Sequence, residues 1–219
     1  MATTPYILNE IQSIDLGTTV AELKEAFKSS SYSHLPIVKD KVLIGLISET
    51  DMEGIEDSEK EIGNFYDLFQ LFFSEESSNL LEILKLFAIH ETNLVPVVNA
   101  QKNYIGYYDL IDILHEYNDT PFMKHEGELL ILEKEIHDYS FFEVCQIVES
   151  NKGQVLGLFI SESSDEKIKI TLKFDAQEIN EIIQSFRRYN YRVLSNHKED
   201  LHLEDLIDRS NYLQKYLNI

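Results

Sequence analysis

The chain contains the stretch HLPIV at residues 34–38 and, sixty residues later, LVPVV at residues 94–98. Both are short apolar runs with a proline at the same place, as expected of buried strands. Apolar residues with the spacing of a helix precede each run, at 20–27 in the first case and at 80–87 in the second. Similarity at a fixed distance along a chain indicates an internal repeat.

A second strand and a second helix complete each copy of the repeat. After a polar turn, the apolar run VLIG occupies residues 42–45, and its counterpart YIG occupies residues 104–106. From here the distance is sixty-one residues, so the second turn carries one extra residue, where an insertion costs little. Helices are expected to start near Ser48 and near Asp109. The unit is therefore helix, strand, strand, helix, and two units must pack together to cover their small sheets.

The repeat resembles tandem CBS domains, which form a Bateman module. The order of elements and the proline-containing strand carry the resemblance, together with the closing pattern Gly-x-x-Ser/Thr-x-x-Asp. GLISETD at residues 45–51 fits this pattern, whereas GYYDLID at residues 106–112 has Asp where the family has Ser or Thr. The resemblance implies a CBS pair over residues 1–120, with the first repeat at about 6–60 and the second at about 65–118.

In the CBS family this pattern commonly holds an adenosine nucleotide. By resemblance, Asp51 would bind the ribose hydroxyls and Ser48 the sugar or phosphate, while residues around the strand proline would flank the base. The first candidate site thus consists of Ser33, His34, Leu35, Pro36, Ser48 and Asp51. Asp109 and Asp112 mark a degenerate second site, in which the Asp109 carboxylate would repel phosphate. AMP, ADP, ATP and S-adenosylmethionine are the candidate ligands.

A structural role competes with ligand binding at the first site. A serine three residues before an acidic residue is also typical of a helix N-cap, and in that case the pocket is vestigial. Glu49 and Glu53 lie close by and basic residues are scarce, which favours an adenosine or a monophosphate over a triphosphate. Asp109, Asp112 and His115 follow one helical face, but this pattern is typical of a solvated surface, and we predict no metal site.

The second half of the chain has a different pattern, in which strands and helices alternate. Strands are expected near 128–133, 154–160, 167–174 and 191–194. Helices are expected after Ser140 and Asp175, each of which would be the N-cap. This β-α-β-β-α-β order is that of the ferredoxin-like fold. It resembles an ACT domain over residues 125–197, so that the whole chain is similar to acetoin-utilisation-type bacterial regulators. The resemblance implies an oligomerising platform; Tyr139 and Ser140 replace the Pro-Gly that the family's amino-acid site uses.

Residues 198–219 are expected to form an amphipathic C-terminal helix. Their apolar side chains, which include Leu203, Leu206, Ile207 and Leu213, recur with helical spacing. Such a stripe either packs on the protein itself or recruits another protein, and the sequence leaves both roles open.

Charge and composition narrow the function further. Nineteen Lys and Arg oppose 39 Asp and Glu, a formal net charge of −20, and so acidic a surface repels nucleic acids and anionic membranes. No apolar run reaches the length of a membrane span, and no secretion signal is visible. Cys145 is the only cysteine, which fits a packed thiol in a reducing compartment. We expect a cytoplasmic protein without nucleic-acid or membrane partners.

The sequence contains no catalytic motif that we recognise, and the chain is predicted not to be an enzyme. Two functions remain. In the first, a regulatory protein senses an adenosine-type nucleotide in the CBS cleft and transmits the signal through a homodimer or higher homo-oligomer to a protein target. In the second, the chain is a ligand-free oligomerising scaffold or protein-interaction module.

Overall fold

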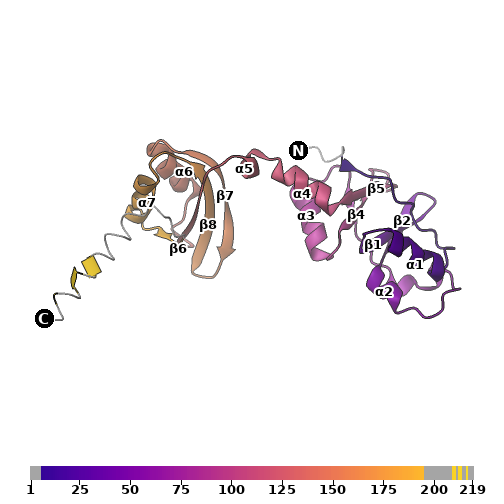
Figure 1. The fold of residues 1–219 in the computed structure, drawn as a ribbon. Coiled ribbons are helices and arrows are strands. Elements are labelled where there is room, and N and C mark those ends of the chain that lie inside the picture. The colour runs from indigo at the N-terminus through magenta and orange to yellow at the C-terminus, as the bar shows by residue number, and fades with distance from the viewer. Residues whose placement is uncertain (1–5, 195–208, 211, 214–215, 217–219) are drawn as a thin grey trace. The chain divides into compact units, whose positions relative to one another are not determined.

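The computed structural model describes residues 6–194, 209–210, 212–213 and 216. The chain divides into two compact units, Met1–Asp119 and Thr120–Ile219 (Figure 1). Most of the amphipathic helix expected at 198–219 lies outside the described residues. Its described positions, from 209 onwards, are helical and exposed.

The first unit contains the expected order of helix, strand, strand, helix twice. The first copy consists of α1 (Val20–Ser29), β1 (His34–Lys39), β2 (Val42–Ser48) and α2 (Glu49–Glu53). The second copy consists of α3 (Leu80–Ile89), β4 (Leu94–Val98), β5 (Tyr104–Asp109) and α4 (Leu110–Asn118). Two short 3-10 turns, Ile62–Asn64 and Tyr66–Leu68, and the short strand β3 (Ser74–Glu75) connect the copies.

The first helix of each copy begins with the same capping motif. A side chain before the helix, Thr19 for α1 and Asn79 for α3, accepts a hydrogen bond from a backbone amide of the first turn. The side chains of Glu22 and Glu82 accept a hydrogen bond from the backbone amide of the cap residue, so both helices begin with a capping box. Each helix then buries one apolar stripe, made of Val20, Leu23 and Phe27 in α1 and of Leu80, Ile83 and Phe87 in α3.

The segment that leads into each copy pairs with a strand of the other copy. Leu8, ahead of the first copy, pairs with Tyr107 of β5 through two backbone hydrogen bonds of 2.8 and 2.9 Å. Gln70, ahead of the second copy, pairs in the same way with Leu46 of β2. The side chain of Leu46 lies in the apolar core of the second copy. The two copies therefore share an interface, as the repeat requires.

A glycine of the second strand lies against each leading segment. A Cβ atom at Gly106 would lie 2.2 Å from the carbonyl oxygen of Leu8, and the φ angle of Gly106 is +145°, which side chains rarely adopt. At Gly45 the corresponding contact, to the Gln70 oxygen, would be 3.2 Å. The glycine that ends each apolar run is thus explained by the close approach of the leading segment.

The second unit is a four-stranded antiparallel sheet with two long helices, α6 and α7, on one face (Figure 1). Its elements are α5 (Pro121–Lys124), β6 (Glu128–Glu135), α6 (Phe141–Ser150), β7 (Gln154–Ser163), β8 (Lys167–Asp175), α7 (Ile179–Arg188) and β9 (Arg192–Val193). The strand order β7-β8-β6-β9 is that of the ferredoxin-like fold. The expected α+β fold class is confirmed.

Two details of the second unit differ from the sequence prediction. The short helix α5 was not expected, because four residues are too few to show a period. Asp175 was expected to cap the second helix, but it is the last residue of β8, and α7 starts only at Ile179 without a side-chain cap. By contrast, Ser140 caps α6 as expected, accepting from the amide of Glu143.

Candidate functional site

The first candidate site lies where β2 turns into α2. Ser48 is the N-cap of α2, and its Oγ accepts a hydrogen bond of 3.0 Å from the Asp51 amide. The same hydroxyl donates a 2.7 Å bond to Oδ2 of Asp51. Ser48 is buried and Asp51 is half-buried. The capping role is therefore present, and it also fixes the Asp51 carboxylate beside the serine hydroxyl, the pairing that the nucleotide hypothesis needs.

The register of the hairpin brings the remaining site residues to this point. His34 lies opposite Ser48 in the antiparallel pair β1–β2, and the amide of Glu49 donates to the carbonyl oxygen of Ser33 at 2.9 Å. Leu35 and Pro36 follow in β1 and are buried, Leu35 within the core of the first copy. All six sequence-predicted residues of the first site thus come from neighbouring ends of β1, β2 and α2.

The second copy supplies residues to this site that sequence reasoning missed. Oδ1 of Asn93 accepts bonds from the Ser33 amide (2.8 Å) and from the Ser33 hydroxyl (3.1 Å). Gln70 contributes its Nε2, which lies 3.5 Å from Oδ2 of Asp51. Asn93 occupies the place of Ser33 in the second copy, so its position was predictable from the offset of sixty residues, although its contact was not.

Two histidines flank Phe72 beside the site. The ring of Phe72 stacks on His90 with centroids 3.8 Å apart, and it meets His34 edge to face at 6.0 Å. His34 is only 6% exposed, and its Nδ1 lies 2.9 Å from the Ser33 hydroxyl. Burial lowers the pKa of His34, and nearby His90 lowers it too, although the Asp51 carboxylate raises it. Burial also lowers the pKa of His90. Burial thus disfavours the protonated form of both rings.

The second candidate site has the same backbone geometry with different chemistry. Asp109 is the N-cap of α4 and accepts bonds from the amides of Ile111 (2.7 Å) and Asp112 (3.2 Å). An ionised carboxylate has no proton to donate, so Asp109 cannot hold the Asp112 carboxylate as Ser48 holds Asp51. Among the described residues, no three His, Cys, Asp or Glu side chains are grouped so that they could hold a metal ion.

The second unit has a charged cavity near the turn that follows β6. Its volume is about 560 Å³, and ten residues line it: Glu133, Lys134, Glu135, Asp138, Glu143, Lys167, Arg188, Tyr189, Asn190 and Arg192. Lys134 is its most buried base, bonded to Glu143 at 2.6 Å, with its ammonium 4.1 Å from the centre of the Tyr191 ring. Cys145 is half-buried, and burial and the nearby Glu149 carboxylate raise its pKa, which disfavours a reactive thiolate.

The first unit is thus a pair of α-β-β-α repeats in contact with each other, with the Ser48–Asp51 pair at the start of α2 beside that contact. In agreement with this, residues 3–53 match the family model described as CBS domain. An uncharacterized protein of Methanocaldococcus jannaschii is 20% identical over 109 residues, which are 50% of this chain and 41% of that protein. The chain therefore matches less than half of the length of that relative.

Solved structures of CBS proteins resemble this chain over about half of its length. A CBS domain pair/ACT domain protein from Thermotoga maritima has 20% identity and a TM-score of 0.48, with 53% of this chain and 96% of that chain covered. The CBS domains of a transcriptional regulator from Streptococcus pneumoniae have 16% identity and a TM-score of 0.46, with 52% and 98% covered. CBSX2 in complex with AMP has 17% identity and a TM-score of 0.46, with 53% and 95% covered.

The described residues also bear on membrane insertion. None of their helices has the length and apolar character that a bilayer span requires.

Proposed function

We propose that this chain is a non-catalytic regulatory protein that binds an adenosine-type nucleotide at the first site of its repeat pair. One observation carries the proposal: the Asp51 carboxylate is held beside the Ser48 hydroxyl by a 2.7 Å bond, at the junction of the two copies. A carboxylate accepts hydrogen bonds from both hydroxyls of a ribose, and a hydroxyl can bond a sugar or phosphate oxygen. Ser33 and His34, where β1 begins, would flank the base.

The charge of the first unit limits which ligand can bind. Its residues 1–119 contain seven Lys and no Arg against 21 Asp and Glu. The negative field of such a unit opposes the binding of several phosphate charges. We therefore expect adenosine, AMP or S-adenosylmethionine, which carries a positive sulfonium group, to bind more tightly than ADP or ATP.

A ligand at this site would act on the arrangement of the two copies. The site takes Ser48 and Asp51 from the first copy, and it is bordered by Asn93 of the second copy and by Gln70 of the segment between them. A ligand with different affinities for two arrangements of the copies shifts their populations. In the proposed function, a homodimer passes this shift to a protein target. The ligand-free scaffold is the alternative, in which Ser48 serves only as a helix cap.

Calorimetric titration of the full chain with adenosine, AMP, ADP, ATP and S-adenosylmethionine tests the proposal. We expect binding of at least one compound, and a loss of at least about tenfold in affinity for Asp51→Asn, which keeps the size of the side chain but removes its charge. Asp112→Asn at the matching position of the second copy is the control and should leave this binding unchanged. If no compound binds, or if Asp51→Asn binds as well as the parent protein, the scaffold function is favoured. Circular dichroism checks that both variants fold.

A further inference from the structure

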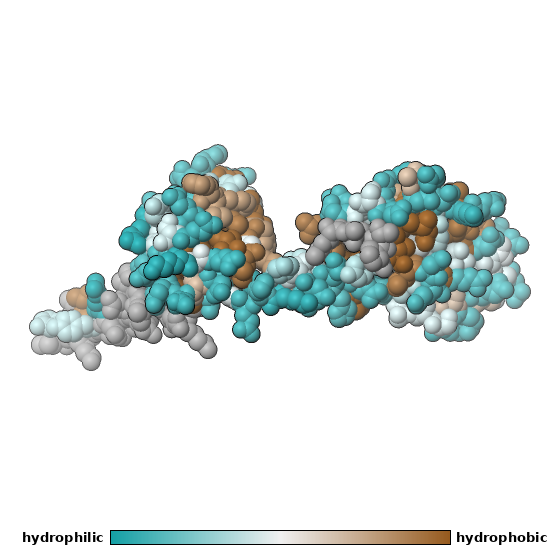
Figure 2. All heavy atoms as spheres, turned by 90° about the horizontal axis from the view of Figure 1, so that it is seen from above, coloured by the Kyte–Doolittle hydropathy of each residue, from teal (hydrophilic) through white to brown (hydrophobic). Residues whose placement is uncertain are grey.

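His34 is a buried polar residue of the first site whose side chain is hydrogen-bonded on one edge only. The residue is 6% exposed, whereas hydrophilic residues cover most of the first unit on the face drawn in Figure 2. Nδ1 of its ring lies 2.9 Å from the Ser33 hydroxyl, and Nε2 has no hydrogen-bond partner among the described residues. The fully buried side-chain atoms that lack a partner in this part of the chain are Tyr104 Oη and Asn180 Oδ1. Nε2 of His34 is not one of them, so it keeps contact with solvent.

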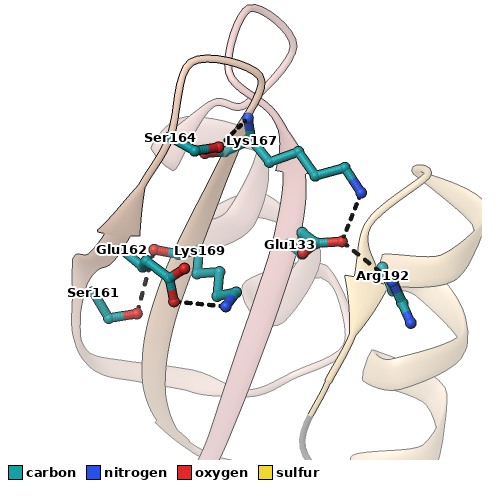
Figure 3. A network of polar contacts seen from close by, with 7 residues as sticks. All are labelled: Glu133, Ser161, Glu162, Ser164, Lys167, Lys169 and Arg192. Atoms are coloured by element: carbon teal, nitrogen blue, oxygen red, sulfur yellow. Dashed lines mark hydrogen bonds and ion pairs between the residues drawn. The ribbon is translucent and has the colours of Figure 1, made fainter.

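Charged side chains on the sheet of the second unit, by contrast, are already paired within the chain. Glu133 receives ion pairs from Lys167 at 3.1 Å and from Arg192 at 3.5 Å (Figure 3). Lys169 pairs with Glu162 at 2.6 Å. A ligand that bound these groups would have to replace bonds that they already make. The unpaired ring nitrogen of the first site can bind a ligand without such a loss.

The hydrogen bonds around Ser33 determine which ring nitrogen of His34 carries the proton. The orientation of the Asn93 amide is fixed, because its Nδ2 donates to the Ser31 carbonyl and its Oδ1 accepts from the Ser33 amide, both at 2.8 Å. The Ser33 hydroxyl therefore donates its single proton to Oδ1 of Asn93, at 3.1 Å, since two lone pairs would otherwise face each other. It accepts from the Asn93 amide at 3.3 Å and has one lone pair left for His34. Nδ1 of His34 must then be a donor.

The other nitrogen of the ring is consequently an acceptor. Burial lowers the pKa of His34 from its ordinary value of 6.5, and His90 lowers it too, while Asp51 raises it. Asp51 on α2 and His90 at the end of α3 are the charged or titratable groups that face the ring from other elements. At pH 7.5 the ring is therefore neutral, with its one hydrogen on Nδ1. Nε2 carries a lone pair and points away from Ser33.

We infer that Nε2 of His34 determines which base the first site accepts, because it takes a hydrogen bond from the 6-amino group of an adenine. The inference rests on the proposed function, in which Asp51 binds the ribose and His34 flanks the base. Adenine has N–H donors at position 6, whereas guanine and hypoxanthine have an oxygen acceptor there. Two acceptors that face each other form no bond, and a site built around a hydrogen bond strongly rejects a ligand that lacks the donor. The second copy has the apolar residue Leu94 at this place and lacks such a group.

The proton assignment is tested in the free protein, without a ligand. In a long-range nitrogen–proton NMR spectrum of the full chain at pH 7.5, His34 should show a protonated Nδ1 and an unprotonated Nε2. The His34→Leu variant identifies these signals by their loss. Ser33→Ala removes the hydroxyl that holds the ring, and part of the proton should then move to Nε2. A parent protein with the proton on Nε2 would overturn the inference, and so would an unchanged spectrum in Ser33→Ala.

The choice of base is tested by calorimetry at pH 7.5 with AMP and inosine monophosphate, which differ at position 6. AMP should bind about thirtyfold more tightly, because the oxygen of the second ligand leaves Nε2 without a bond. The purine riboside monophosphate with hydrogen at position 6 should bind with an intermediate affinity. In His34→Leu and in Ser33→Ala the ratio of the AMP and inosine monophosphate affinities should fall below about threefold.

His137→Leu is the matched control, because His137 is an exposed histidine of the second unit. This variant should keep the ratio of the parent protein, and circular dichroism checks that all variants fold. If the parent protein binds both monophosphates equally well, the inference is overturned and the proposed function stands. If it binds neither of them nor any other adenosine compound, the proposed function is overturned together with the inference.

Discussion

The two copies of the repeat share a framework and differ in the chemistry placed on it. In both, a residue at the end of the second strand caps the next helix, Ser48 for α2 and Asp109 for α4. In both, the first backbone amide of that helix donates to a residue just ahead of the first strand, Ser33 or Asn93. Only Ser48 both accepts a hydrogen bond from the helix and donates one to the acidic side chain three residues later. The first copy therefore fixes the Asp51 carboxylate, whereas the second copy does not fix that of Asp112 in this way. Equal geometry therefore need not mean equal function.

The largest expected effect concerns the two glycines that lie against the leading segments. Gly106→Ala should lower the free energy of unfolding by about 3 kcal/mol or more, because the new Cβ would meet the Leu8 oxygen at 2.2 Å at a φ angle of +145°. Gly45→Ala should cost about 1 kcal/mol or less, since its contacts of 3.1 and 3.2 Å are relieved by small shifts and alanine restricts the unfolded chain. Urea unfolding followed by circular dichroism measures both. Equal losses would contradict the asymmetry between the two pairings.

The next effect concerns the contact between the copies at Ser33 and Asn93. Asn93→Ala should cost about 2 kcal/mol, because it removes the acceptor of the Ser33 amide and hydroxyl and the donor to the Ser31 carbonyl. Ser33→Ala should cost about 1 kcal/mol, since its own amide still bonds Asn93. The same urea titration measures the difference. A larger loss for Ser33→Ala than for Asn93→Ala would show that the hydroxyl carries the contact.

Much of the first unit could be predicted from the sequence because the repeat is local. Strand, turn and helix recur at offsets of sixty and sixty-one residues, and each is specified by residues close in the chain. The pairing of each leading segment with the other copy could not be predicted in this way. Leu8 and Gln70 form isolated bridges without any period, and their partners are about a hundred residues away in one case and 24 in the other.

The candidate site was predictable only in part, for the same reason. Ser48 and Asp51 were found because their spacing lies within one turn of a helix. Three further residues reach the site through tertiary contacts with the first copy, namely Gln70, Phe72 and Asn93. No spacing in the sequence predicts such contacts. The offset of the repeat would have pointed to Asn93 alone, as the counterpart of Ser33.

A smaller effect separates the two helix caps. Asp109→Ala should lower the free energy of unfolding by about 1 kcal/mol, because Asp109 satisfies two backbone amides of the nine-residue helix α4 and its charge favours the helix start. Ser48→Ala should cost somewhat less, since Ser48 satisfies one amide of a five-residue helix. Thermal unfolding of both variants tests the order. A clearly larger loss for Ser48→Ala would indicate that its bond to the Asp51 carboxylate stabilises the fold beyond capping.

The smallest expected effect is a change in the pH dependence of stability, and it concerns His34. This residue occupies the place in β1 that Leu94 occupies in β4. Burial lowers the pKa of His34 from its ordinary value of about 6.5. In the unfolded chain the ring takes up a proton at a higher pH than in the fold, so His34 lowers stability as the pH falls below about 6.5 and has no such effect above it. His34→Leu should therefore reduce the loss of unfolding free energy between pH 7.5 and pH 5.5. An unchanged loss in His34→Leu would contradict the prediction.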